Sequence, residues 1–187
     1  MKKVMLTIAL IWSCCLYINA QSKLPPIDKS PMDMAYYPAG YPVLKIQDKI
    51  TEPLIARVIY SRPQKSGRTI FGQLLEYGKL WRLGANEATE IEFFKPVRIG
   101  GTKIKKGRYT LYCIPNADTW TILVNKDTDI WGSFKYDESK TIATVNLPVH
   151  KQNEMQEHFV MAFEKSPNGA ILTMAREDIS VNLPISF

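Results

Sequence analysis

The chain has 187 residues, 45% of them hydrophobic and 22% charged, and it carries 24 Lys and Arg against 18 Asp and Glu, a formal net charge of +6. This basic excess lacks the clustered Lys and Arg and the fold signature of a nucleic-acid-binding protein, so we expect no nucleic-acid partner. One domain is the default expectation for a chain of this length, because it can hide about 70% of its unfolded surface.

The first 20 residues have the pattern of an export signal. Lys2 and Lys3 form a basic start, a largely apolar run fills positions 4–18, and Ala20 is a small residue suited to cleavage. The apolar run is shorter than the about 20 residues that a membrane span needs, and no later stretch comes close. We therefore predict a mature chain that starts at Gln21, has no transmembrane segment and is periplasmic or extracellular.

The three cysteines bear on anchoring and on stability. Cys14 and Cys15 lie inside the signal, so attachment of a lipid to one of them is an alternative to simple cleavage. Bulky Trp12 upstream and apolar residues downstream disfavour that alternative. Cleavage leaves Cys113 alone, which excludes an intramolecular disulfide and predicts that this residue is a small buried hydrophobe.

Residues 21–53 are rich in proline and lack a periodic apolar pattern. Because a helix does not tolerate such a density of proline, we predict an extended N-terminal arm without helix. Its tyrosines, Tyr36, Tyr37 and Tyr41, favour a strap that packs across the domain over a mobile linker. Residues 54–187 are expected to form the domain itself.

After residue 53 apolar residues recur at every second position, which is typical of half-buried strands. Turn-forming residues at 100–101, 115–116 and 168–169 punctuate the pattern. Short strands at this spacing predict an all-β fold, a single antiparallel β-sandwich or jelly roll with little helix. Helix is expected for a turn or two at 70–75 and at 151–157. The predicted strands are 54–60, 89–94, 108–114, 120–125, 141–147, 158–164, 170–175 and 179–183.

The segment VRIGGTKIKKGRY, residues 97–109, predicts a basic hairpin. A two-residue turn at Gly100 and Gly101 would place Arg98 opposite Lys103. Like charges directly opposed are unfavourable, so an acidic side chain such as Glu92, or an anionic ligand, is expected between them. The alternative is that the lysines only protect an exposed strand edge from pairing with another chain.

Metal and cofactor chemistry is not indicated. The mature chain has two histidines, His150 and His158. Eight residues apart on a helix they would be separated by about 12 Å, and on a strand by more, which one zinc ion with ligands near 2 Å does not bridge. We therefore expect surface histidines, no metal and no cofactor.

Two glutamates suggest one catalytic alternative. Glu90 and Glu92 point to the same face of a strand with Cα atoms about 6.5 Å apart, near the carboxyl separations that glycosidases use. A glycan-directed hydrolase acting through Glu87, Glu90 or Glu92 is therefore an alternative function. The plainer interpretation is the half-exposed face of an ordinary strand.

The segment GKLWRLGANEATEIEF, residues 78–93, contains aromatic, guanidinium, amide and carboxylate groups, and the segments YSRP and NKDTDIWG contain more of them. Aromatic faces stack on apolar faces of sugars, while planar polar groups bind hydroxyls. The same side chains can instead fill a core and pin a loop, for example by pairing an arginine with Glu87. The candidate ligand-binding residues are Arg62, Trp81, Arg82, Asn86, Glu87 and Trp131.

These segments also carry a family resemblance. YGKLWRLGANEAT, IGGTKIKKGRYTLYCIP, WTILVNK and WGSFKYD resemble the domain of unknown function 2911 family, found in exported bacterial proteins. The resemblance covers about residues 57–187 and implies a compact β-rich domain, without an established activity or substrate. The chain departs from the family pattern at Thr141, Thr144 and Arg176. The positions that match the family signature are Arg62, Trp81, Arg82, Gly84, Asn86, Glu87 and Thr89.

From these residues we predict a non-enzymatic binding or accessory module for a carbohydrate or cell-envelope ligand. Trp81 is expected to stack on the ligand, Arg82 and Glu87 to make charged hydrogen bonds, and Asn86 to orient it. The alternatives are the hydrolase above and a purely structural or partner-docking domain.

Overall fold

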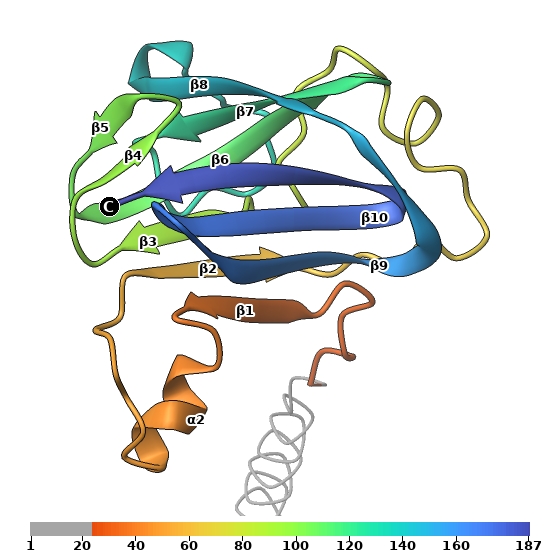
Figure 1. The fold of residues 1–187 in the computed structure, drawn as a ribbon. Coiled ribbons are helices and arrows are strands. Elements are labelled where there is room, and N and C mark those ends of the chain that lie inside the picture. Colours follow the sequence, from red (N-terminus) through yellow and green to blue (C-terminus); the bar gives the residue numbers. More distant parts are fainter. Residues whose placement is uncertain (1–23) are drawn as a thin grey trace, which may run out of the picture.

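The computed structural model of the protein describes residues 24–187. The predicted export signal, residues 1–20, lies outside the described residues. Figure 1 shows two β-sheets that form the two layers of a sandwich, with a short helix outside the edge of the larger sheet. The sheets are antiparallel and do not close into a barrel, which confirms the predicted all-β sandwich.

The larger sheet has six strands in the order β1-β2-β3-β6-β7-β8, and the smaller sheet has four in the order β5-β4-β10-β9. The strands are Met32–Tyr37 (β1), Ala56–Ser61 (β2), Glu90–Phe93 (β3), Val97–Ile99 (β4), Thr102–Ile104 (β5), Gly107–Pro115 (β6), Thr119–Asn125 (β7), Thr141–Pro148 (β8), His150–Ser166 (β9) and Gly169–Ser186 (β10). The helical segments are Tyr41–Ile46 (α2) and Glu138–Lys140 (η1).

The core lies between the sheets, where the inward positions of each strand alternate with outward ones. In β2, Ala56, Val58 and Tyr60 are buried, whereas Arg57 and Ile59 on the opposite face are half-exposed. Cys113 in β6 is fully buried, as the sequence predicted, and burial raises the pKa of its thiol well above the usual value.

The N-terminal arm packs against the domain as a strap. Strand β1 pairs antiparallel with β2 at the edge of the larger sheet. Tyr37 at its end is buried against the rings of Phe163 and Phe187, with centroids 6.2 and 5.5 Å away. Asp33 in β1 accepts a hydrogen bond from Arg62 at 3.0 Å, which ties the strap to the end of β2.

The helix predictions were wrong. Residues 151–157 lie in β9, because pairing with β10 decides their conformation. Residues 70–75 form turns and an isolated bridge. The arm, in contrast, contains helix α2, in which Pro42 lies in the first turn, where its missing N–H is not needed.

A β-bulge in β10 turns Arg176 into the protein. The register between β9 and β10 shifts on both sides of Glu177, and Arg176 is only 2% exposed. Its Nη2 donates a long hydrogen bond of 3.4 Å to the Gln64 carbonyl, and its Nε has no partner among residues 24–187. Removal from water, with repulsion from Arg68, lowers the pKa of this guanidinium to about 10, and Glu177 offsets part of that shift.

Replacing Arg176 with methionine removes the buried cation but keeps an unbranched apolar side chain. Because desolvation is the largest cause of the lowered pKa, we expect the free energy of unfolding to rise by about 1 kcal/mol, measured by urea denaturation at pH 7. The control Lys126→Met, at an exposed position, should stay within about 0.5 kcal/mol of the parent. A clear loss of stability in Arg176→Met would show that attraction to Glu177 and Glu157 outweighs desolvation.

Candidate functional site

The loop that precedes β3 begins in the core. The backbone of Trp81 exchanges hydrogen bonds with Cys113 of β6, at 2.7 and 2.8 Å. The indole of Trp81 is 4% exposed, makes an edge-to-face contact with Trp120 and a tilted contact with Phe159, and donates from Nε1 to the Gly84 carbonyl at 2.9 Å. Its predicted role of stacking on a ligand is therefore at odds with its burial, because neither face of the ring reaches solvent.

The middle of the loop is pinned to β2 by a buried hydroxyl. Ser61 Oγ donates to the Ala85 carbonyl at 2.7 Å and accepts the Ala85 N–H at 2.6 Å. Gly84 lies so close that a Cβ there would be 2.6 Å from Ser61 Oγ. Thr89 closes the loop by donating from its hydroxyl to the Leu83 carbonyl. Gly84 and Thr89 thus have structural roles, which follow from the close approach of loop and strand.

The end of the loop pairs with a distant segment, residues 129–132. Ala88 N–H donates to the Ile130 carbonyl, and Gly132 N–H donates to the Asn86 carbonyl, both at 2.9 Å. Glu87 and Trp131 are therefore directly opposite each other in an isolated antiparallel bridge, which places their side chains on the same face. Both side chains are exposed, and that of Trp131 is 60% exposed.

Beside this bridge the outer face of the larger sheet is hollowed. A hollow of about 180 Å³ adjoins a smaller one of about 60 Å³, and the two share Ile59 and Glu90. We call the two hollows together the outer-face groove, because the residues that they share point away from the core. Its lining is Met32, Arg57, Ile59, Glu87, Ala88, Glu90, Glu92, Arg108, Asp129 and Ile130.

Most charges of the outer-face groove neutralise one another. Glu92 pairs with Arg57, and Arg108 pairs with both Glu90, at 3.4 Å, and Asp129. Glu90 also accepts the backbone N–H of Asp129, which holds the 127–132 segment over the sheet. Glu90 and Glu92 are thus each ion-paired with a guanidinium group, an arrangement that favours a structural use of these carboxylates over acid–base catalysis.

The remaining predicted residues, Asn86, Arg62 and Arg82, are not part of the groove lining. The amide of Asn86 donates to Asp28 at 2.9 Å and so binds the start of the arm. Arg62 pairs with Asp33 at the Met32 end of β1. Arg82 is half-buried with its Nε unpartnered among the described residues, and burial lowers the pKa of its guanidinium. The structure therefore brings Asn86, Glu87 and Trp131 together, whereas the proposed pairing of an arginine with Glu87 is absent from residues 24–187.

Sequence reasoning missed part of the groove. Met32 and Ile59 form its apolar floor, and Asp129 forms one wall, although they come from β1, β2 and a distant loop. Of these residues, only Asp129 lies in a segment that the sequence had singled out, NKDTDIWG. In the described part of the chain, no three His, Cys, Asp or Glu side chains are grouped to hold a metal ion.

Comparison with known proteins identifies a family. The family described as Protein of unknown function (DUF2911) matches residues 42–185. No curated protein and no solved structure matches the chain significantly. Within residues 24–187, none of the helices has the length and apolar character needed to cross a membrane.

The tight approach of Gly84 to Ser61 provides a test of the loop's structural role. Gly84→Ala should lower the free energy of unfolding by about 2 kcal/mol, measured by urea denaturation, because the new methyl group overlaps the hydroxyl that binds Ala85. Gly78→Ala is the matched control: its Cβ meets nothing within 4 Å, so only the cost of a positive φ, about 1 kcal/mol, is expected. Equal losses in both variants would contradict the pinned loop.

Proposed function

The chain belongs to the DUF2911 family of proteins of unknown function, and we propose that it is an exported, non-enzymatic binding or accessory module for a carbohydrate or other cell-envelope ligand. The proposed site is the outer-face groove with Trp131 and Glu87 at its rim. Export is proposed from the N-terminal pattern of residues 1–20, and binding from side chains that the fold brings together.

The exposure of Trp131 carries this proposal. Full burial of a large apolar side chain stabilises a fold by about 2–3 kcal/mol, a gain that an exposed tryptophan forgoes. Phe134, in the same loop, is 82% exposed, and its ring lies over Gly132, where a Cβ would be 2.7 Å from the ring edge. Two exposed rings in a loop held by backbone hydrogen bonds are a surface suited to contact with a ligand.

The chemistry at the rim fits a polyol. The indole of Trp131 offers a flat apolar face, and the carboxylate of Glu87 beside it accepts hydrogen bonds from hydroxyl groups. The apolar floor of Met32 and Ile59 continues the surface into the hollow. Because the loop is tied to β2 and to residues 130–132, the site is largely preformed, which lowers the entropy lost on binding.

Binding is preferred to hydrolysis on one specific ground. A glycosidase needs one carboxyl group that carries a proton and a second that stays ionised. In the groove, Glu92 is paired with Arg57, and Glu90 is paired with Arg108 and accepts a backbone N–H. Both carboxylates are therefore engaged by partners within the protein, which favours a role in shaping the groove over direct contact with a glycosidic bond.

The first test is a glycan-binding screen of the mature protein with two rim variants. Trp131→Ala should weaken binding about 30-fold, the loss typical of a central aromatic contact, and Glu87→Gln should weaken it about tenfold. Both variants should keep the parent's midpoint of thermal unfolding, because both side chains are exposed. Tyr77→Ala, which removes an exposed ring from another loop, is the control and should bind normally.

Two results would contradict this site. Full binding by folded Trp131→Ala and Glu87→Gln would place the ligand elsewhere. Turnover of a glycan that Glu90→Gln abolishes without a loss of stability would establish the hydrolase alternative instead.

Export is tested separately, by N-terminal sequencing and mass spectrometry of the full-length protein produced in a bacterial host. We expect a periplasmic or secreted chain that begins at Gln21. Lipid on Cys14 or Cys15 in a membrane fraction would support the lipoprotein alternative. A cytosolic chain that keeps residues 1–20 would contradict export.

A further inference from the structure

A second recess lies at the other end of β1. The outer-face groove includes Met32 at the start of this strand, whereas the second recess includes Tyr37 at its end. The β4–β5 hairpin and the C-terminal end of β10 lie at the same end of the sandwich (Figure 1). The recess measures about 640 Å³, and we call it the basic-end pocket.

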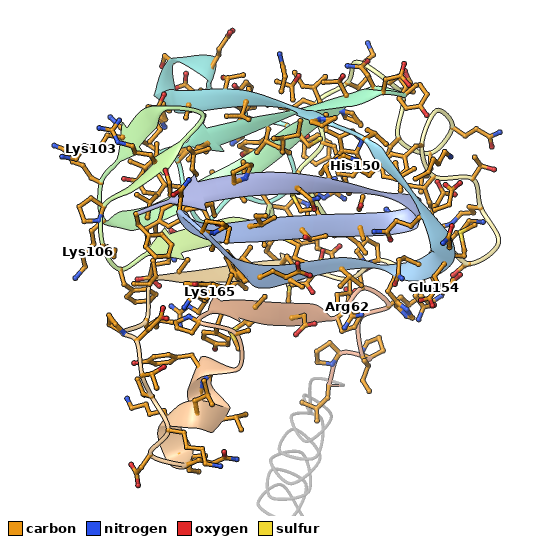
Figure 2. The ribbon with its side chains drawn as sticks, viewed as in Figure 1. Arg62, Lys103, Lys106, His150, Glu154 and Lys165 are labelled. Atoms are coloured by element: carbon orange, nitrogen blue, oxygen red, sulfur yellow. The ribbon has the colours of Figure 1, made fainter. Side chains whose placement is uncertain are left out.

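Three cationic side chains contribute to the wall of the basic-end pocket. Arg98 from β4, Lys103 from β5 and Lys165 from β9 line it. Figure 2 shows Lys103 and the nearby Lys106 extending from this end of the molecule. Glu52 supplies the one acidic side chain in the lining and pairs with Lys165 at 2.8 Å. Arg98 and Lys103 therefore leave an unbalanced positive charge.

Arg98 and Lys103 face each other across paired strands. The Gly100–Gly101 turn sets this register, as the sequence predicted. The acidic side chain expected between them is not Glu92, which pairs with Arg57 on the other sheet. Arg98 Nη1 donates instead to the Gly101 carbonyl at 3.0 Å, and neither cation is in an ion pair among residues 24–187. Opposed like charges destabilise a strand pair, so an anion bound between Arg98 and Lys103 would offset their repulsion.

The other side of the basic-end pocket is suited to a larger molecule that carries the anion. The rings of Tyr37 and Phe187 pack together and provide an apolar wall. Lys95 lies over the Phe187 ring at 5.0 Å from its centroid, which places a further cation near the rim. Ser186, in the lining, adds a hydroxyl group that can bind an anionic oxygen.

We propose that the basic-end pocket binds a phosphate ester, carried by a glycan or by a lipid headgroup. The guanidinium fork of Arg98 suits two oxygens of a phosphate, and Lys103 acts as a point charge beside it. A phosphate monoester carries about −1.5 to −2 charges at pH 7, which matches the two unpaired cations. The sugar or glycerol part then lies along Tyr37 and Phe187. The residues of this site are separate from those of the outer-face groove.

Two probes distinguish the two sources of phosphate. Glucose 1-phosphate, titrated by calorimetry with glucose as the uncharged control, tests the free ester. Phosphatidylcholine vesicles with and without phosphatidic acid, a lipid whose headgroup is a phosphate monoester, probe the lipid headgroup in a flotation assay. We expect the mature protein to bind at least one of the two phosphate monoesters and neither glucose nor pure phosphatidylcholine vesicles, which have no net charge, with an affinity that falls as salt rises.

Three variants assign the binding to the pocket. Arg98→Gln with Lys103→Gln should weaken it about 25-fold, from roughly fivefold for each cation removed. Lys79→Gln with Lys135→Gln changes the net charge equally at exposed sites outside the pocket and should have little effect. Glu52→Gln removes the competing carboxylate and should strengthen binding roughly fivefold, a gain that a purely structural role of these residues does not produce.

The outcomes separate cleanly. If the protein binds glucose 1-phosphate and the pocket variants change that affinity, a glycan phosphate is supported. If it binds the anionic vesicles but not glucose 1-phosphate, a lipid headgroup is supported. Equal losses in the pocket double variant and the Lys79/Lys135 control would indicate diffuse charge attraction and overturn the proposal, as would binding of neither probe. Trp131→Ala should leave phosphate binding unchanged, so failure of the outer-face groove is distinguishable from failure here.

Discussion

The structure depends on the burial of Trp81 between the two sheets. Its indole contacts Trp120 of the larger sheet and Phe159 of the smaller one, with ring centroids 5.7 and 5.1 Å away. Its backbone is bonded to Cys113, so the loop that leads to β3 cannot shift without disturbing β6. Close-packed aromatic rings contribute a large share of the stabilising free energy of a core, and their packing fixes the position of the segment to which they belong.

The outer-face groove follows from that constraint. With Trp81 in the core and Ala85 bonded to Ser61, the chain turns outward at Asn86 and meets residues 130–132. The ion pairs of Arg57 and Arg108 then hold the carboxylates of the sheet face in one arrangement. The proposed binding surface is thus supported from below by the core and from the side by charge pairing, rather than formed by free loops.

Charge is distributed unevenly over the molecule. On the outer face acids and arginines neutralise one another, whereas at the basic end Arg98 and Lys103 stay unpaired in the described part of the chain. The strap β1 runs between these two regions and contributes Met32 to one and Tyr37 to the other. An edge strand from the proline-rich arm therefore helps to build both surfaces.

The sequence by itself determined most strands of the domain and one register. Period-two alternation separated the buried Val58 from the outward Arg57, because successive side chains of a strand must point to opposite faces. The two-glycine turn set Arg98 against Lys103, because loop length decides hairpin register. Only the tertiary structure decided that 151–157 is strand, since pairing with β10 overrides a weak local preference. It also decided that Trp81 is core and Trp131 is surface: the two residues have the same chemistry, and only packing by segments distant in the chain distinguishes them.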